Sequence, residues 1–269
     1  MNNMSIEIST IGSGSKGNSV YIGTKDTKIL IDAGLSGTKI ESALKDINLS
    51  LEDIDAIFVT HEHSDHIDGV GVISRRYNLP VYATEGTWSN MPQKVGKISK
   101  HNQKIVYKDE GILLNDIFIR PFEVPHDAKE PVCYSILYNG IKVCVATDMG
   151  HITRNVIENI RHCSALVLES NHDVNMLKLS NYPYALKERI LGKYGHISNE
   201  TCGKLLACVM NDKLKNVFLG HLSQDNNTPD LAYLTVANIL DEFGIKAEKD
   251  VNLHIAKPYG ITELIKVEE

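Results

Sequence analysis

The stretch IFVTHEHSDHIDG at residues 57–69 places three of the chain's 11 histidines and two acids within six positions, directly after an apolar run. Imidazole and carboxylate groups packed this closely repel one another or lose hydration unless a cation binds them. His61 and His63 stand two residues apart in a loop, so their rings can turn to one ion. Asp65 and His66 can reach a second ion about 3.5 to 4 Å away, the usual spacing of a two-metal site. The stretch therefore predicts a metal centre.

Each ion needs further ligands, and three later positions offer them. FEVPHD supplies His126, VCVATDMG supplies Asp148 and VFLGHLS supplies His221, each after a predicted strand. A single histidine after a strand is more often structural. Three such positions combined with HEHSDH favour ligands held at the rigid ends of strands. Ligation by nitrogen and oxygen alone suits Zn²⁺ or Mn²⁺, and we expect two divalent ions per chain.

Composition limits what kind of protein carries this centre. With 269 residues, 42% of them apolar and 23% charged, the chain can bury a full core. We find no linker, so residues 1–269 are expected to form one domain. Apolar runs such as ALVL at 165–168 are far shorter than the roughly 20 residues of a membrane span, so we expect no membrane partner.

The start of the chain and its cysteines favour a cytoplasmic location. MNNMSIEIST lacks a basic segment followed by an apolar stretch, which is the pattern of a secretory signal. Five scattered cysteines form no CxxC pair, and an odd number fits reduced thiols.

The order of predicted elements indicates an α/β fold. Strands are expected in IEISTIG, VYIG, KILIDAG and AIFVT, followed by a β-rich region at 104–147 with an NG hairpin turn at 139–140. Helices are expected after Ser36 or Thr38, around 70–77, near 151–160, over parts of 173–191, from Ser198, and from Pro229 to the stop at Gly244. Strands SALVLES and NVFLG alternate with the later helices. Two blocks of strands with helices between and after them predict a four-layer αββα sandwich.

These motifs together resemble the metallo-β-lactamase superfamily across nearly the whole chain, and most closely its YycJ (WalJ, VicX) branch. The likeness is carried by GSGSKGNS, ILIDAGLSG, VTHEHSDHIDGVG, VPHDA, ATDMG, LESNHD, GHISN and LGHLS. Superfamily motifs indicate fold and metals well, and substrate poorly.

The resemblance assigns the ligands. It implies that His61, His63 and His126 bind one metal, that Asp65, His66 and His221 bind the other, and that Asp148 bridges them. Asp32, at the end of KILID, is implied to hydrogen-bond the ligand loop, although it could simply end a strand. No cysteine occupies a metal position, which counts against β-lactam hydrolysis.

Glu169 in LESNHD and His196 in GHISN resemble elements that nuclease members place beside the metals. The implied role of His196 is protonation of the leaving group, with Glu169 orienting it and favouring its charged form. A structural role is an alternative for each. We count both, with Asp65, as candidate catalytic residues.

Phosphate contacts are expected in two places. GSGSKGNS can cradle a phosphate through Ser13, Ser15 and Asn18, although a tight hairpin near the site is an equal alternative. The segment 93–104 carries Lys94, Lys97, Lys100 and Lys104 and no acid, so it can bind a nucleic-acid backbone despite the net charge of −6, or be an ordinary solvated surface. A second basic segment, 178–193, with Lys187, Arg189 and Lys193, is the next candidate.

We therefore expect a two-metal hydrolase that acts as a phosphodiesterase or nuclease on nucleic acid, with DNA and exonuclease action favoured by the resemblance. The alternatives are a thioester hydrolase of the glyoxalase II type, an RNA-processing nuclease, and a regulatory metal-binding protein without catalysis. The C-terminal 50 residues predict only one long helix and two short strands, which is little for a glutathione-binding region.

Overall fold

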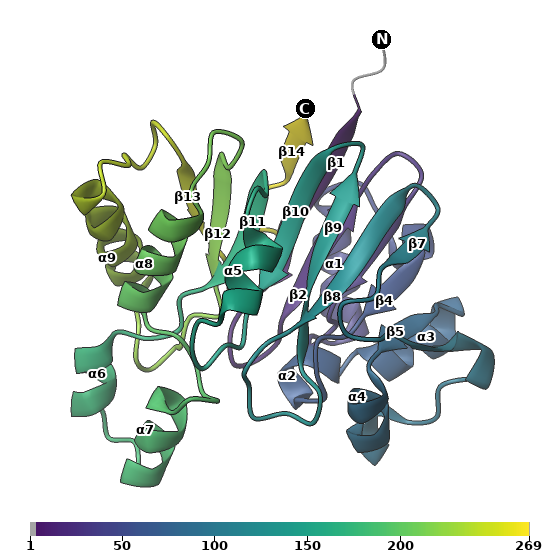
Figure 1. Cartoon of the computed structure of the whole chain (residues 1–269). Helices are drawn as coiled ribbons and strands as arrows, with labels where there is room; N and C mark the ends of the chain where they lie inside the picture. Colours follow the sequence, from purple (N-terminus) through teal and green to yellow (C-terminus); the bar gives the residue numbers. More distant parts are fainter. Residues whose placement is uncertain (1–3, 269) are drawn as a thin grey trace.

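Two seven-stranded β-sheets face each other in a computed structural model that describes residues 4–268, apart from the side chain of Lys94 (Figure 1). The first sheet has the order β14 (Ile265–Glu268), β1 (Ser5–Gly12), β2 (Ser19–Gly23), β3 (Lys28–Ile31), β4 (Ala56–Phe58), β5 (Val81–Ala83) and β6 (Gln103–Ile105). The second has the order β13 (Asn252–Ile255), β12 (Asn216–Gly220), β11 (Ala165–Glu169), β10 (Ile141–Ala146), β9 (Val132–Tyr138), β8 (Ile117–Glu123) and β7 (Ile112–Leu114).

Helices cover the outer face of each sheet. Packed on the first sheet are α1 (Gly37–Lys45) and α3 (Val70–Tyr77), with the short α2 (Ser64–Ile67) and α4 (Glu85–Asn90) nearer its lower end in Figure 1. The second sheet carries α5 (Arg154–Ile160), α8 (Asn199–Val209) and α9 (Pro229–Glu242). Below these lie α6 (Val174–Leu179) and α7 (Tyr184–Leu191), and three 3₁₀ turns are η1 (Leu51–Asp53), η2 (Gln93–Val95) and η3 (Lys100–Asn102). None of the described helices is long and apolar enough to span a membrane.

Three apolar clusters hold the four layers together. One lies between the sheets and includes Ile8, Phe58, Tyr134 and Phe218, all fully buried. The other two lie between each sheet and its own helices. Because both faces of each sheet are covered, the central strands read as nearly continuous apolar runs, as the sequence shows. The expected four-layer sandwich is confirmed.

Local signals explain several element boundaries. Asn139 and Gly140 both have positive φ, 45° and 81°, and turn β9 into β10 as the NG pair predicts. Thr228 caps α9 by accepting a hydrogen bond from the backbone N–H of Leu231, with Pro229 as the first helical residue. The helical region expected over 173–191 is two short helices, because Pro183 interrupts it.

The strand directions bring the motif loops together. β3 to β6 run parallel in the first sheet, and β10 to β13 run parallel in the second. Side chains that follow parallel strands collect at one edge of a sheet. Asp32, His61, Asp148 and His221 follow β3, β4, β10 and β12, so both sheets deliver residues to one end of the sandwich.

Candidate metal centre

The histidines and acids expected from the sequence converge into linked clusters. Groups whose potential ligand atoms lie within 4.8 Å of one another are His61 with His63 and His126; Asp65 with His66 and His221; His61 with His66 and Asp148; and Asp148 with Glu169, His196 and His221. The first two groups are the two expected metal sites, and Asp148 belongs to both of the others. Loops of both sheets contribute to this one centre.

The first group has the spacing of a metal site. Nδ1 of His63 lies 3.1 Å from Nε2 of His61 and 3.3 Å from Nε2 of His126. Ligand atoms around a tetrahedral ion with bonds of about 2.0–2.1 Å are roughly 3.3–3.4 Å apart. Uncharged ring nitrogens at this distance repel through their lone pairs, so a cation between them fits better than direct hydrogen bonds.

Acceptors behind the rings fix which nitrogen each histidine turns inward. Nδ1 of His61 contacts Thr60 Oγ1 at 3.0 Å, Nδ1 of His66 contacts Asp32 Oδ2 at 2.7 Å, and Nδ1 of His126 contacts the carbonyl of Gly195 at 3.2 Å. When Nδ1–H donates, Nε2 carries a free lone pair toward the cluster. His63 is the exception, since it turns Nδ1 inward.

Asp32 links the first sheet to the ligand loop. Its Oδ1 accepts the backbone N–H of Thr60 and its Oδ2 accepts the Thr60 hydroxyl, both at 2.8 Å, in addition to His66. These contacts are those expected of a residue that holds the ligand loop in place.

Glu169 supports two histidines rather than one. Its Oε1 lies 2.7 Å from Nδ1 of His196 and 3.0 Å from Nδ1 of His221, and its Oε2 accepts the backbone N–H of Met149 at 2.9 Å. The carboxylate therefore orients both the candidate proton donor and a candidate ligand. The sequence indicated only the first of these contacts.

Charges in the cluster are strongly coupled. Burial would lower the pKa of His221, but the charge of Asp148 and the nearby carboxylates of Asp65 and Glu169 raise it to about 10. Burial and the neighbouring histidines lower the pKa of His61, which keeps that ring neutral and able to ligate. Burial alone would raise the pKa of Asp148, yet the surrounding histidines lower it. The buried carboxylates therefore need positive charge beside them to remain ionised.

Five buried side-chain atoms of the described residues have no hydrogen-bond partner. Two of them, Oδ2 of Asp148 and Nε2 of His221, lie at the meeting point of the clusters. Buried polar atoms are rarely left unsatisfied. A divalent cation would satisfy both, so the residues present fit the metals that the family implies.

Three turn residues of the site have a left-handed backbone. Asp32, Asp148 and His221 have φ of 61°, 59° and 56°, a region that residues other than glycine adopt at a cost. Each is the turn residue that redirects the chain after a strand and aims its side chain at the cluster.

A cavity of about 250 Å³, the metal pocket, opens over the cluster. His63, Asp65, Asp148, His196 and His221 line it on the cluster side. The remaining lining residues are Ser15, Asn171, Tyr182, Leu186, Arg189, Ile190 and Ser223. Helix α7 thus forms one wall, tied down by an ion pair between Arg189 Nε and Asp127 Oδ2 at 2.5 Å.

The expected phosphate contacts lie in different places. Ser15 lines the metal pocket, whereas buried Ser13 accepts the backbone N–H of His221 at 2.7 Å. Asn18 lies inside the cluster, with Nδ2 3.1 Å from Asp65 Oδ2 and from His66 Nε2. Lys97, Lys100 and Lys104 are exposed, and none of the described side chains of 93–104 lines the metal pocket. The side chain of Lys94 is outside the described part of the structure.

Three supporting residues were not found from the sequence. Asn171 donates from Nδ2 to the carbonyl of His221 at 2.9 Å, Thr60 bridges Asp32 and His61, and Asp127 joins His126 to Arg189. Asp127 follows His126 directly and Thr60 precedes His61, so adjacency to a ligand was the available signal. Asn171 had no signal beyond its place in LESNHD.

Comparison with known proteins agrees with this geometry. Residues 27–217 match the family model described as the beta-lactamase superfamily domain. The chain belongs to the metallo-β-lactamase superfamily. It is 41% identical, over 97% of its length and 99% of the relative's, to a Bacillus anthracis protein named exodeoxyribonuclease YycJ. It is 37% identical, over 99% of its length and 100% of the relative's, to exodeoxyribonuclease WalJ of Streptococcus pneumoniae serotype 2, strain D39.

A solved structure shows the same fold at low identity. The metallo-β-lactamase fold protein YhfI of Bacillus subtilis superimposes with a TM-score of 0.72 at 15% identity, over 98% of this chain and 99% of that one. The family implies divalent metals, and the clustered ligands described above are where this chain can hold them.

Proposed function

We propose that this protein is a two-metal phosphodiesterase that degrades DNA as an exonuclease. The observation that carries the proposal is the similarity to the two proteins named exodeoxyribonucleases, which covers 97–99% of this chain. The metal cluster, with its open pocket and the Glu169–His196 pair on the pocket wall, supports hydrolysis at phosphorus.

Seven side chains would hold the ions: His61, His63 and His126 on one, Asp65, His66 and His221 on the other, and Asp148 between them. Divalent ions supply Lewis acidity toward a phosphoryl group and make a nucleophile from water at neutral pH. Zn²⁺ and Mn²⁺ both suit this set of nitrogen and oxygen ligands.

His196 is the proposed proton donor to the leaving oxygen. Its Nδ1 is engaged by Glu169, which leaves Nε2 as the exchangeable position, and the ring is 21% exposed on the pocket wall. Glu169 is fully buried; burial would raise its pKa, but the charge and hydrogen bond of His196 lower it, so the carboxylate stays ionised and orients the His196 ring. Asp65 lines the same pocket and is proposed to act as both ligand and positioning group.

Backbone recognition is proposed for groups around the pocket. Ser15 and Arg189 line its rim and can bind phosphate oxygens next to the scissile bond. Lys97, Lys100 and Lys104 are proposed to contact the DNA further along the strand, since no residue of their segment lines the metal pocket.

The test combines metal content with hydrolysis. We expect up to two transition-metal ions per chain by elemental analysis, hydrolysis of bis-p-nitrophenyl phosphate, and shortening of end-labelled DNA in preference to RNA when Mn²⁺ or Zn²⁺ is supplied. A protein that binds neither ion contradicts the metal assignment. Bound metal without hydrolysis of any phosphodiester would instead indicate a regulatory binding protein.

A further inference from the structure

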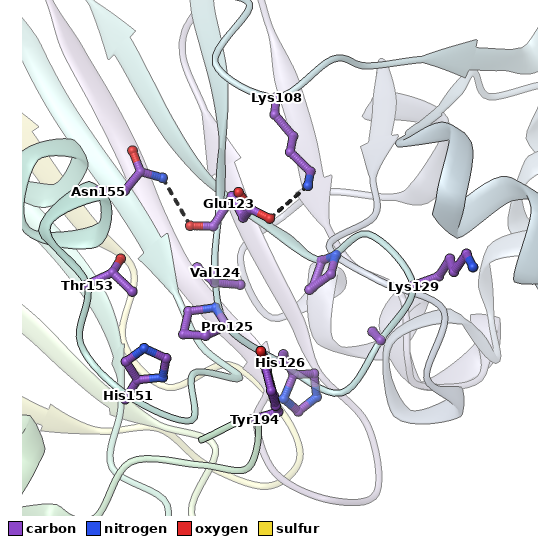
Figure 2. Close-up of a pocket in the computed structure, with 12 residues that line it drawn as sticks. Lys108, Glu123, Val124, Pro125, His126, Lys129, His151, Thr153, Asn155 and Tyr194 are labelled. Carbon is purple, nitrogen blue, oxygen red and sulfur yellow. Dashed lines mark hydrogen bonds and ion pairs between the residues drawn. The ribbon is translucent and has the colours of Figure 1, made fainter. Parts of the chain in front are cut away.

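A second cavity lies beside His126, which is not among the residues that line the metal pocket. Its volume is about 450 Å³, and Figure 2 shows its lining. Val124, Pro125 and His126 run along it, with Lys108 and Lys129 on one side and His151, Thr153 and Asn155 on the other. Tyr194 stands beside His126 at its lower end. We call this cavity the second pocket.

The two pockets share a thin partition. His126 lines the second pocket, while its Nε2 lies 3.3 Å from Nδ1 of His63 in the metal cluster. Segment 194–196 completes the partition, because Tyr194 lines the second pocket and His196 lines the metal pocket. The second pocket is therefore bounded by His126, a candidate ligand of the cluster.

The partition is held rigidly. The carbonyl of Tyr194 accepts the backbone N–H of Asp127 at 3.1 Å, and the carbonyl of Gly195 contacts Nδ1 of His126. Gly150 packs against the same segment so closely that a Cβ there would lie 2.3 Å from the carbonyl oxygen of Lys193. Both pockets therefore keep a fixed position relative to one another.

The lining of the second pocket combines features that suit a nucleoside. The Tyr194 side chain is available for stacking, since the residue is 60% exposed, and base–aromatic stacking tolerates any base. His151 donates from Nδ1 to the carbonyl of Lys193 at 2.8 Å, which leaves its Nε2 as an acceptor. Val124 and Pro125 offer an apolar surface for the flat faces of the base and sugar.

Charge on the route between the pockets suits a phosphate backbone. Lys129 has no carboxylate within ion-pair distance among the described residues, so its ammonium is free for a phosphate. Asp127, the acid on the partition, is neutralised by Arg189 at 2.5 Å. A strand that leaves the metal pocket over this partition meets no uncompensated negative charge from Asp127.

We propose that the second pocket binds the nucleoside adjoining the scissile phosphate, with Tyr194 stacking on its base and Lys129 contacting the next phosphate. This inference rests on the proposed function and places one nucleoside of the DNA substrate in the second pocket. Neither residue was singled out from the sequence.

The test compares substrates with and without a nucleoside. Tyr194→Ala should lower kcat/KM for the p-nitrophenyl esters of thymidine 5′-monophosphate or thymidine 3′-monophosphate by roughly 10- to 100-fold, the loss of one stacked base. Hydrolysis of bis-p-nitrophenyl phosphate should be unchanged. Tyr194→Phe keeps the ring and should restore the parent rates, and Tyr184→Ala, at a tyrosine that is 77% exposed and lines neither pocket, is the matched control.

Nucleotide binding separates failure of this inference from failure of the proposed function. If the parent hydrolyses none of these esters, the proposed function fails. Equilibrium dialysis with thymidine 5′-monophosphate then tests nucleotide binding in the second pocket independently of hydrolysis, and weaker binding by Tyr194→Ala supports the inference. Lys129→Gln should weaken binding of thymidine 3′,5′-bisphosphate, which carries both phosphates, but not of thymidine. Equal behaviour of Tyr194→Ala and Tyr184→Ala toward every nucleoside ester and toward the nucleotide overturns the proposal.

Discussion

Pairs of a buried carboxylate and an imidazole stand behind the candidate ligands. Asp32 accepts from His66, and Glu169 accepts from both His221 and His196. Such partners fix the ring orientation and raise the basicity of the inward nitrogen. The two acids differ in their partners, because only Glu169 contacts both a candidate ligand, His221, and the proposed proton donor, His196. Substitutions can therefore separate metal binding from proton transfer.

His196→Ala is expected to slow hydrolysis of a phosphodiester by about 10² to 10⁴, the usual loss for one general acid, while metal content stays close to that of the parent. The reason is that the seven proposed ligands remain. Steady-state rates and elemental analysis of the same preparation check this. Loss of metal from the variant would place His196 among the ligands, which its position in a cluster with Asp148 and His221 permits.

Glu169→Gln is expected to lower both the metal affinity and the rate of hydrolysis. An amide lacks the negative charge, and its NH2 group would meet the backbone N–H of Met149 that Oε2 now accepts, so both rings should be held less firmly. Metal affinity should therefore fall about 10- to 100-fold, and turnover should fall as well. Metal titration followed by rate measurement at saturating metal resolves the two losses. Glu158→Gln, at an exposed carboxylate on α5 that pairs with Arg154, is the control and should change neither. Unchanged metal affinity in Glu169→Gln would show that the contact with His221 does not support binding.

At the scale of elements, the site depends on three loops that touch through their backbones. The N–H of Asn18 donates to the carbonyl of Asp65 at 2.7 Å, and the N–H of Gly34 donates to the carbonyl of Asn18 at 2.8 Å. A Cβ on Gly34 would lie 1.6 Å from the carbonyl oxygen of Asp65. Only glycine allows this approach, so the loop after β3 fixes the position of the HEHSDH loop.

Gly34→Ala should therefore displace the HEHSDH loop, costing about 1–3 kcal/mol of unfolding free energy or more, and should weaken metal binding. Urea denaturation with and without added metal provides the measurement. Gly37→Ala is the matched control: it lies in α1, a Cβ there approaches Ile73 Cγ1 at an ordinary 3.4 Å, and alanine favours the helix. Equal stability of both variants would show that the loop contact can relax freely.

The elements, and the clustering of the candidate ligands, could be predicted because both depend on local patterns. HEHSDH places four candidate ligands within six positions, and a residue directly after an apolar strand is identified by its neighbours. Contacts between distant loops could not be predicted in this way. Glu169 and His221 are 52 positions apart in the sequence, and their hydrogen bond forms only when the layers pack together. The same holds for the ion pair between Arg189 and Asp127. The basic segment 93–104 looked like a backbone-binding surface by composition, yet it lines neither pocket beside the cluster.

At the scale of the whole molecule, the net charge of −6 makes DNA binding depend on where the cations stand. If Lys97, Lys100 and Lys104 contact DNA away from the cluster, changing all three to Gln should reduce the log–log salt slope of DNA affinity by roughly 0.7 to 0.9 per lost contact. Hydrolysis of bis-p-nitrophenyl phosphate should persist. Binding isotherms across a salt series make the comparison, and an unaltered slope would leave this segment an ordinary solvated surface.

β14 returns to pair with β1, with Glu268 opposite Ser5 in the register. The start of β1 and the end of β14 therefore lie side by side, and Figure 1 shows both at the end of the molecule opposite α2. A fluorescent label, an affinity handle or a surface anchor attached beyond either strand would thus join the molecule far from α2, which carries Asp65 and His66. Immobilised molecules would all present the same face outward, which suits single-molecule observation of a strand being shortened.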